Sequence, residues 1–432
     1  MSQQWFGRPL IALVGGTILL GLTLGTAVKF GRQAIAQSPS PSSPPTMNQI
    51  EDSDEDLDVN ARLVAANTRF GFKLFSQILE QNGEPTNLMV SPTSVAIALT
   101  MTYNGASGTT QQAMADALEL EGMSLEEINQ ANAALELALE NADPEVQLAI
   151  ANSLWSREDT SFNPDFLQRN RDFYSAEVAS LDFTNPSAIA TINNWVSRNT
   201  QEKITEIIRE INPNAVLFLI NATYFKGNWT TPFNAELTSD RSFTLLDGSQ
   251  KQHPTMSQRG FYAYLETDQF QAVSLPYGES ERLSMYVFLP RESSSLTAFQ
   301  QNLTAENWET WMSQFSREEG AITLPRFKLE YETQLNEALQ TLGMAVAFDA
   351  EQADFSGMSD ESLSISRVKH KTFIEVNEEG TEAAAVTSVE MQLTSAPANS
   401  PFQMEVDRPF FYAIRDNQTE TVLFMGTVVE PE

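Results

Sequence analysis

Residues 377–394 read NEEGTEAAAVTSVEMQLT, near the C-terminal end of a 432-residue chain. The stretch begins with acidic residues and Gly380, continues through three alanines and then becomes β-branched. Alanine and glutamate favour a helix, whereas β-branched residues favour a strand. A passive linker is a third interpretation. The segments on either side of this stretch decide between the three.

The first half of the chain is predicted to be mainly helical, because apolar residues recur there at spacings of three and four. Ser91-Pro92 is a typical start, with a capping serine and a proline in the first turn. Helices are predicted over residues 62–79, 91–106, 109–142, 162–174 and 186–209.

The second half is predicted to be mainly stranded, because β-branched and aromatic runs alternate there with turn residues. Strands are predicted over residues 146–156, 215–229, 242–248, 261–266, 271–277, 283–290, 321–331, 371–380, 409–416 and 421–430. Helices before strands indicate an α+β domain with large, mostly antiparallel sheets.

Composition excludes several classes of function. The net charge of −31, from 57 acidic and 26 basic residues, repels phosphate backbones and argues against a nucleic-acid partner. The chain has no cysteine, so thiolate nucleophiles and cysteine zinc sites are excluded. His253 and His370 are the only histidines, and neither belongs to an HExxH motif. His253 lies in a polar stretch and is expected to be a surface residue. No metal or cofactor site is predicted.

Enzyme motifs are also missing. The chain has no GxSxG elbow, Walker loop or dinucleotide fingerprint. We therefore expect no catalytic residues and no enzymatic activity.

The N-terminal part is predicted to be separate from the folded domain. Residues 9–28 form an uncharged, mainly apolar run, and twenty residues in a helix span about 30 Å, enough for a bilayer. Ala34-Ile35-Ala36 matches the small-x-small pattern of signal cleavage. Residues 1–36 are therefore a signal peptide or a membrane anchor, and the protein is expected to be exported. Residues 37–59 form a Pro/Ser-rich and acidic linker, and residues 60–432 form the folded domain.

The stretch EEGTEAAA, residues 378–385, resembles the proximal hinge of the serpins, a family of serine protease inhibitors. Four other segments resemble parts of this family in the same order, over about residues 62–430. They are NLMVSPTSVAIALTMTYNGA (a helix), LINATYFKGNW (a central strand), RVKHKTFIEVNEEGTEAAA (the run into the reactive-centre loop) and RPFFYAIRDNQTETVLFMGTVV (the C-terminal strand pair).

The resemblance implies a fold of three β-sheets and about nine helices, with an exposed reactive-centre loop. It implies a monomer whose partner is a target serine protease. The protease attacks a loop carbonyl and forms a covalent acyl ester. The cleaved loop then inserts into the main sheet and distorts the enzyme before water can release it. The alternative function is that of a non-inhibitory serpin-fold binding or chaperone protein.

The resemblance makes Glu378 the hinge glutamate. The hinge residues that it implies are Glu378, Gly380, Thr381, Ala383, Ala384 and Ala385. In an inserted strand alternate side chains face the core, so Thr381, Ala383, Ala385 and Thr387 would be buried and Glu382 would face solvent. All four buried side chains are small and uncharged, and a buried unpaired charge would cost several kcal/mol. This pattern suits insertion and argues against the non-inhibitory alternative.

Two further groups of residues carry over from the family. The shutter, a buried polar cluster where the central strands part, would consist of Ser91, Ser94, Asn221 and His370. The breach, at the top of the sheet, would contain Trp229 and Arg326, and an ion pair between Arg326 and Glu378 is predicted.

The reactive bond is predicted at Thr394–Ser395 from the family's spacing. Ala398 is an alternative because the segment after the bond is longer than usual, Leu393 is one if the register slips by one residue, and Met391 is a third. No lysine or arginine lies between Glu379 and Asp407, which excludes trypsin-like targets. Elastase-, chymotrypsin- and subtilisin-like proteases remain as targets. No polyanion cofactor is expected, because residues 119–145 contain no basic side chain.

Overall fold

The computed structural model describes residues 59–212, 214–381 and 400–432. The first described helix begins at Ala61. Asn60 caps it, because the Asn60 side chain accepts hydrogen bonds from the backbone nitrogens of Arg62 and Leu63.

Helices occupy most of the first half of the described chain. Their bounds are α1 (Ala61–Asn82), α2 (Pro92–Tyr103), α3 (Gly108–Ala117), α4 (Leu125–Glu140), α5 (Pro164–Tyr174), α6 (Ser187–Asn199), α7 (Leu296–Gln301), α8 (Ala305–Met312), α9 (Asn336–Leu339) and α10 (Ala345–Phe348), with η1 (Ala235–Leu237) and η2 (Gln340–Met344). Because η2 joins α9 to α10 without a gap, the number of helical runs among the described residues agrees with the expected number.

Strands dominate the second half. Their bounds are β1 (Leu88–Val90), β2 (Val146–Arg157), β3 (Glu177–Leu181), β4 (Leu217–Asn228), β5 (Ser239–Thr244), β6 (Gln250–Glu266), β7 (Phe270–Tyr277), β8 (Leu283–Pro290), β9 (Ser316–Pro325), β10 (Phe327–Gln334), β11 (Arg367–Val376), β12 (Gly380–Thr381), β13 (Phe402–Glu405), β14 (Phe410–Asp416) and β15 (Val422–Val428).

In the described part of the chain the strands form two hydrogen-bonded sheets, whereas three were expected. One has six strands in the order β10-β11-β12-β4-β2-β3, and the other has nine, in the order β1-β15-β14-β8-β7-β6-β9-β13 with β5 beside β6. The long strand β6 accounts for the difference. Its residues 264–266 pair with β7, whereas its residues 255–264 pair with β9, so β6 joins two sheet regions into one.

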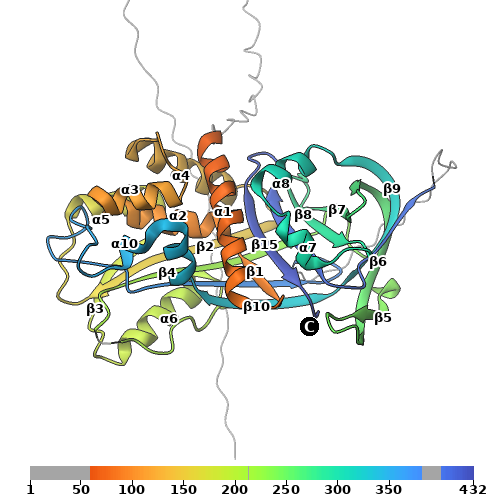
Figure 1. Ribbon diagram of the computed structural model, residues 1–432. Coiled ribbons are helices and arrows are strands. Elements are labelled where there is room, and N and C mark those ends of the chain that lie inside the picture. The colour runs from red at the N-terminus through yellow and green to blue at the C-terminus, as the bar shows by residue number, and fades with distance from the viewer. Residues whose placement is uncertain (1–58, 213, 382–399) are drawn as a thin grey trace, which may run out of the picture. The chain divides into compact units, whose positions relative to one another are not determined.

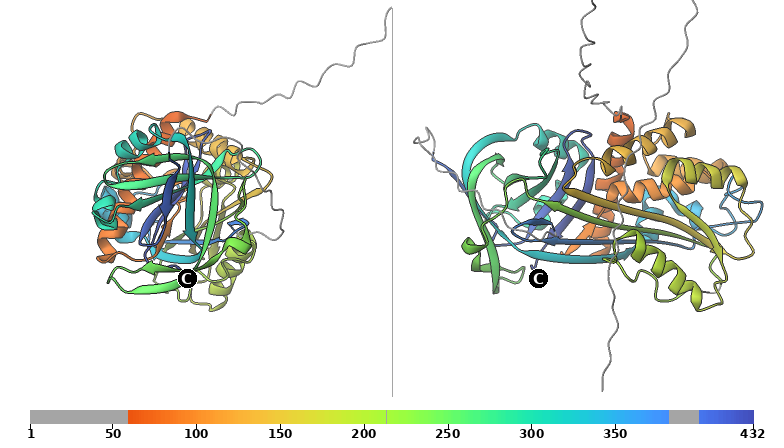
Figure 2. Two further views of the ribbon diagram at one scale, coloured as in Figure 1. Left: turned by 90° about the vertical axis from the view of Figure 1, so that its right-hand side faces the viewer. Right: turned by 180° about the vertical axis from the view of Figure 1, so that it is seen from behind.

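Helices cover both faces of the six-stranded sheet (Figure 1). Helix α6 lies on one face, over a smaller core that includes Trp155, Ile192 and Tyr224. Helix α2 packs on the opposite face against β2 and β4, and the view from behind shows the same layers (Figure 2). Within the described residues, no helix has both the length and the apolar character needed to cross a bilayer.

Two predicted helices are wrong in their extent. The helix predicted over residues 109–142 is interrupted between α3 and α4, where Gly122 has a φ of 74°. The helix predicted over residues 186–209 stops at Asn199, because Gln201 and Glu202 adopt φ angles of 51° and 63°. Such angles are uncommon for residues with a Cβ atom, so nothing in the sequence signalled this end.

The prediction that His253 is a surface residue is also wrong. His253 lies in β6 and is buried, with its Nε2 atom 2.7 Å from the carbonyl oxygen of Arg326.

Candidate functional site

The candidate site lies in the six-stranded sheet, where strand β12 enters between β4 and β11. These two strands are parallel neighbours over residues 218–224 and 367–373. Above that region Thr381 of β12 pairs with Val376 of β11 on one side and with Gly227 of β4 on the other. Both pairings are antiparallel. The hinge segment named from the sequence therefore already occupies the upper end of the gap between two central strands.

Gly380 is the residue that lets the chain enter this gap. Its φ angle is 152°, a conformation that residues with side chains rarely adopt. A Cβ atom at this position would lie 2.1 Å from the carbonyl oxygen of Gly227. Only glycine fits here without displacing β4.

Thr381 faces the core, as its hinge assignment requires. It is fully buried, and its hydroxyl lies 2.8 Å from the hydroxyl of Tyr277 on β7. The Tyr277 ring is stacked on Trp229, with ring centroids 4.4 Å apart. The Trp229 indole nitrogen donates to the carbonyl oxygen of Asn377 at 2.9 Å. Trp229, which the resemblance assigns to the breach, thus contacts the segment that enters the sheet, and the contact of Tyr277 with Thr381 was not predicted.

The structure contains the ion pair predicted between Arg326 and Glu378. Arg326 Nε and Nη2 lie 2.8 Å and 2.5 Å from Glu378 Oε1. Thr238, which the sequence did not single out, donates to the same oxygen. Burial alone would raise the pKa of the Glu378 carboxyl, but the hydrogen bonds from Arg326 and Thr238 outweigh it and hold that pKa below its ordinary value. Glu378 is therefore a buried anion at neutral pH.

Backbone hydrogen bonds tie the same segment to the chain that follows β4. Trp229 N donates to Glu379 O at 2.9 Å, and Phe233 N donates to Glu378 O at 2.8 Å. The Glu378 side chain and main chain are both held, so the hinge begins from a fixed point.

The four predicted shutter residues form one buried cluster below β12. The backbone N–H of Ser91 donates to His370 Nε2 at 3.0 Å, and His370 Nδ1 lies 2.5 Å from Asn221 Oδ1. Ser94 Oγ lies 3.0 Å from the same Asn221 oxygen. Ser91 occupies the N-cap position of α2 as predicted, but its side chain makes no capping hydrogen bond.

His370 is neutral in this cluster. Since Nε2 accepts a hydrogen bond from Ser91, the proton must be on Nδ1, which donates to Asn221. Complete burial lowers the pKa of His370 from 6.5 to about 3.

Two members of the cluster were missed in the sequence. Asn152 on β2 accepts from Asn221 Nδ2 at 2.6 Å, and Thr223 on β4 donates to Ser94 Oγ at 2.8 Å. Asn152 Nδ2 is buried without a hydrogen-bond partner among the described residues. A buried polar network with a spare donor has more than one arrangement within reach, unlike an apolar core.

The remaining predicted positions lie outside the described residues. These are the hinge residues Ala383, Ala384 and Ala385 and the candidate reactive-bond residues Met391, Leu393, Thr394, Ser395 and Ala398.

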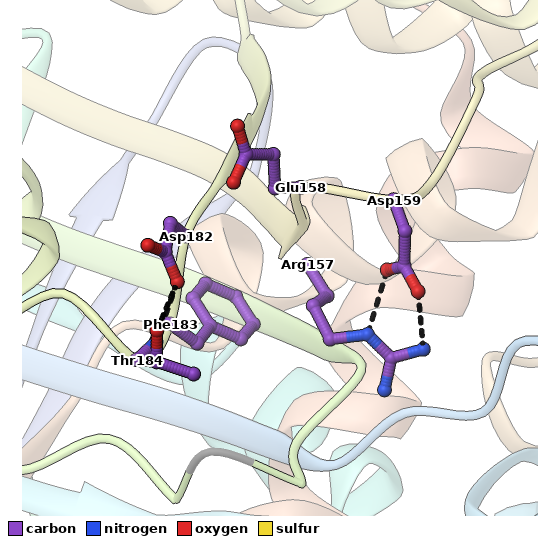
Figure 3. A pocket seen from close by; sticks show the side chains of 6 residues that line it. All are labelled: Arg157, Glu158, Asp159, Asp182, Phe183 and Thr184. Carbon is purple, nitrogen blue, oxygen red and sulfur yellow. Dashed lines mark hydrogen bonds and ion pairs between the residues drawn. The ribbon is translucent and has the colours of Figure 1, made fainter.

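A surface cavity of about 350 Å³ offers no alternative site. Figure 3 shows two interactions among the side chains that line it: Arg157 pairs with Asp159 at 2.6 Å, and Thr184 donates to Asp182. In the described part of the chain, no three histidine or carboxylate side chains gather as a metal site.

Comparisons with known proteins agree on one family. The family model described as Serpin (serine protease inhibitor) matches residues 65–431. The leukocyte elastase inhibitor of Bos taurus is 36% identical over 383 residues, which cover 86% of this chain and 100% of that protein.

Two solved structures show the same fold. The native thermophilic serpin tengpin has a TM-score of 0.80 at 33% identity, covering 86% of this chain and 95% of that one. Human thyroxine-binding globulin complexed with its ligand has a TM-score of 0.79 at 28% identity, covering 86% and 99%.

Proposed function

Because this chain belongs to the serpin family, whose members are mostly protease inhibitors rather than enzymes, we propose that it is a suicide-substrate inhibitor of serine proteases. It would trap the acyl-enzyme by inserting its cleaved reactive-centre loop into the six-stranded sheet.

The placement of β12 is the observation that carries this proposal. Gly380 and Thr381 lie between β4 and β11, and the gap below them is closed only by the parallel pairing of those two strands. A loop that continued from β12 along this gap would replace the parallel pairing of β4 with β11 by two antiparallel pairings, one with each strand. Antiparallel pairings are slightly more stable per residue. The sheet therefore gains pairing energy from the added strand.

The present register of β12 supports the proposal in detail. If the strand continued, Ala383 would come between Phe225 and Ile374, which are both fully buried. Thr387 would come between Asn221 and His370 and would replace their direct hydrogen bond. The inserted strand would therefore place a small apolar side chain beside the apolar residues and a hydrogen-bonding side chain beside the polar ones.

The chemistry comes from the protease. Its serine hydroxyl adds to the carbonyl carbon of the reactive bond, proposed at Thr394–Ser395, and an ester forms at Thr394. The peptide bond breaks, and Ser395 leaves with a new amino group. Insertion then moves the esterified end of the loop to the far end of the sheet. The enzyme is carried with it and cannot complete the hydrolysis of the ester.

The target is proposed to have an uncharged specificity pocket, as in elastase-, chymotrypsin- or subtilisin-like proteases. No cationic side chain lies between Glu379 and Asp407, so a trypsin-like pocket has no partner in this loop. The similarity to an inhibitor named for leukocyte elastase supports the same class.

Several properties follow from the proposal. The chain would act without a catalytic residue, cofactor, metal or polyanion and as a monomer, with the acylated protease as its partner. It would be exported, because residues 1–36 have the pattern of a signal peptide or anchor.

The direct test mixes the purified protein with elastase-, chymotrypsin- and subtilisin-like enzymes. We expect an SDS-resistant conjugate with at least one of them, and mass spectrometry of the released C-terminal peptide identifies the reactive bond. Cleavage of the loop without any conjugate would refute inhibition.

A non-inhibitory binding or chaperone role is the second candidate, because the similar structure of thyroxine-binding globulin contains a small ligand. Such a protein would be cleaved as a substrate and would trap no enzyme. The small, uncharged side chains on the core-facing side of the hinge favour the inhibitor, because selection for binding alone does not require insertable side chains.

A further inference from the structure

An exposed aromatic residue marks a surface of the nine-stranded sheet that neither the core nor the proposed insertion explains. Phe261 on β6 is 52% exposed and is the one aromatic side chain among the large hydrophobic residues that are most exposed in the described part of the chain. Single exposed apolar residues are common and carry no argument alone. The surroundings of Phe261 are what make it unusual.

Two arginines flank Phe261 on the same face. Arg259 shares this face because it is two residues earlier on β6, and Arg317 on the neighbouring strand β9 places its guanidinium 5.1 Å from the Phe261 ring centroid. Both arginines are exposed. Within the described residues, neither forms an ion pair with a carboxylate.

The three side chains form what we call the arginine–aromatic patch, comprising Arg259, Phe261 and Arg317. The cation–π contact holds the Phe261 ring in place, and the strand holds its backbone. The ring therefore loses little freedom when a partner covers it, which lowers the entropic cost of binding. Arg259 retains its donors for a carboxylate of that partner.

The patch lies beside the point where the chain enters the nine-stranded sheet after the reactive-centre loop. Strand β13, which begins just after Ser400, pairs with β9, and Phe402 is opposite Gly320. Phe261 is opposite Glu319 on the other side of β9. Phe261 and Pro401 are therefore two strand spacings apart, about 10 Å. Figure 1 shows β6 and β9 at the end of the molecule where the described chain resumes.

This distance allows a protease that is bound to the reactive-centre loop to contact the patch as well. A standard protein interface buries about 800 Å² on each partner, which corresponds to a disc with a radius of about 16 Å. Pro401 lies six residues after Ser395, at most about 20 Å along an extended chain. An interface that continues from the reactive bond along these residues would therefore end with its rim over the patch. Aromatic and arginine side chains are also the types that dominate binding energy at interfaces.

We propose that the arginine–aromatic patch is an accessory docking surface for the target protease. Phe261 would contact an apolar side chain on the rim of the protease, and Arg259 would pair with a carboxylate beside it. Glu319 and Glu405 lie on the same face, so the surface around the patch is mixed in charge and would favour a protease rim with a complementary pattern of charges. This inference rests on the proposed inhibitory function and adds to it the choice among proteases with similar pockets.

The test compares full-length Phe261→Ala and Arg259→Glu with the wild type, using the protease that the wild type traps fastest. Leu137→Ala on α4 and Arg198→Ala on α6 are the matched controls, because both side chains are exposed and lie far from β6. We expect the second-order rate of conjugate formation to fall at least about tenfold in each patch variant and to stay unchanged in the controls. The stoichiometry of inhibition should not change, because docking precedes cleavage and insertion does not involve the patch.

The outcomes are separable. If the wild type traps no protease, the proposed function and this inference both fail. If the wild type traps a protease and the patch variants do so at the same rate, the docking surface alone is refuted. A rise in stoichiometry without a slower rate would assign the patch to insertion and also refute docking. A concentration-dependent dimer of the inhibitor that Phe261→Ala abolishes, with no effect on trapping, would assign the surface to a second copy of the chain.

Discussion

The carboxylate of Glu378 is held by the guanidinium of Arg326, which lies 52 residues earlier in the sequence. The pair lies two residues before β12, at the point where the hinge enters the sheet. Glu378 is nearly buried, whereas Arg326 remains partly exposed. This contact holds the hinge at the entrance of the gap, and its strength should control how readily the uncleaved loop moves further in.

Breaking this ion pair should lower the kinetic stability of the uncleaved protein. Glu378→Gln removes the charge, and Arg326→Ala leaves a buried carboxylate without its cation, which should cost about 1.5–3 kcal/mol. We expect both variants to convert faster to an inactive, loop-inserted or polymeric form on heating. Native gels and residual inhibition after incubation measure the conversion. Arg291→Ala, which removes a different arginine–carboxylate pair, is the control. Unchanged conversion in both variants would contradict this role.

A charge on the core-facing side of the hinge should turn the inhibitor into a substrate. Ala383→Arg would place a cation between Phe225 and Ile374 on insertion, at a cost of several kcal/mol. Because each 1.4 kcal/mol slows insertion about tenfold, cleavage should then be completed before trapping. Glu382→Arg is the matched control, since its side chain would face outward. We expect many more inhibitor molecules to be consumed per enzyme for Ala383→Arg alone. Equal stoichiometry in the two variants would exclude the proposed register.

The buried histidine should make stability depend on pH. The pKa of His370 is lowered to about 3 in the folded protein, so the imidazole binds a proton only when the cluster opens. Its contribution to stability is complete above pH 6.5 and is lost as the pH falls towards 3, by about 1.4 kcal/mol per pH unit.

His370→Gln should remove this slope while keeping a donor and an acceptor for Asn221 and Ser91. Urea unfolding of both proteins at pH 7 and pH 5 measures how the free energy of unfolding changes with pH. Carboxylates contribute equally to this change in both proteins, so their contribution cancels in the comparison. We expect the wild type to lose about 2 kcal/mol more than the variant between these pH values. Parallel pH profiles would show that His370 is not neutral and buried as described.

A cation at the reactive bond should redirect the inhibitor to trypsin. Thr394→Arg supplies the charge that the aspartate of a trypsin-like pocket requires, and we expect a trypsin conjugate that the wild type does not form. Leu393→Arg, Met391→Arg and Ala398→Arg test the alternative registers. The variant that traps trypsin with the lowest stoichiometry identifies the reactive bond. A trypsin conjugate with the wild type would contradict the exclusion of this protease class.

The fold could be predicted because its evidence is spread along the chain. Helical spacing, strand runs and five collinear segments are local features, and each is legible without knowledge of contacts. The Arg326–Glu378 pair was also predictable, because the resemblance places both residues at the top of the sheet and their charges are opposite. The end of α6 was not predictable, because Gln201 and Glu202 adopt an uncommon backbone conformation without glycine.

The partners that were missed are ordinary residues whose role depends on register between strands. Tyr277, Thr238, Asn152 and Thr223 lie on segments far from the hinge and shutter residues that they contact. Threonine, asparagine and tyrosine are common in strands, and no spacing within one strand shows which residue of another lies opposite. Only the paired sheet brings them to the site.

The central claim is that the uncleaved protein has a higher free energy than its loop-inserted form. Cleavage of the reactive-centre loop would release this difference in free energy by adding a strand to the sheet. The most direct measurement cuts the loop between Glu382 and Asn399 with a protease that is not trapped, and compares thermal unfolding of the cut and intact proteins. The account predicts that the cut protein unfolds at a much higher temperature. An unfolding temperature equal to or below that of the intact protein would contradict it.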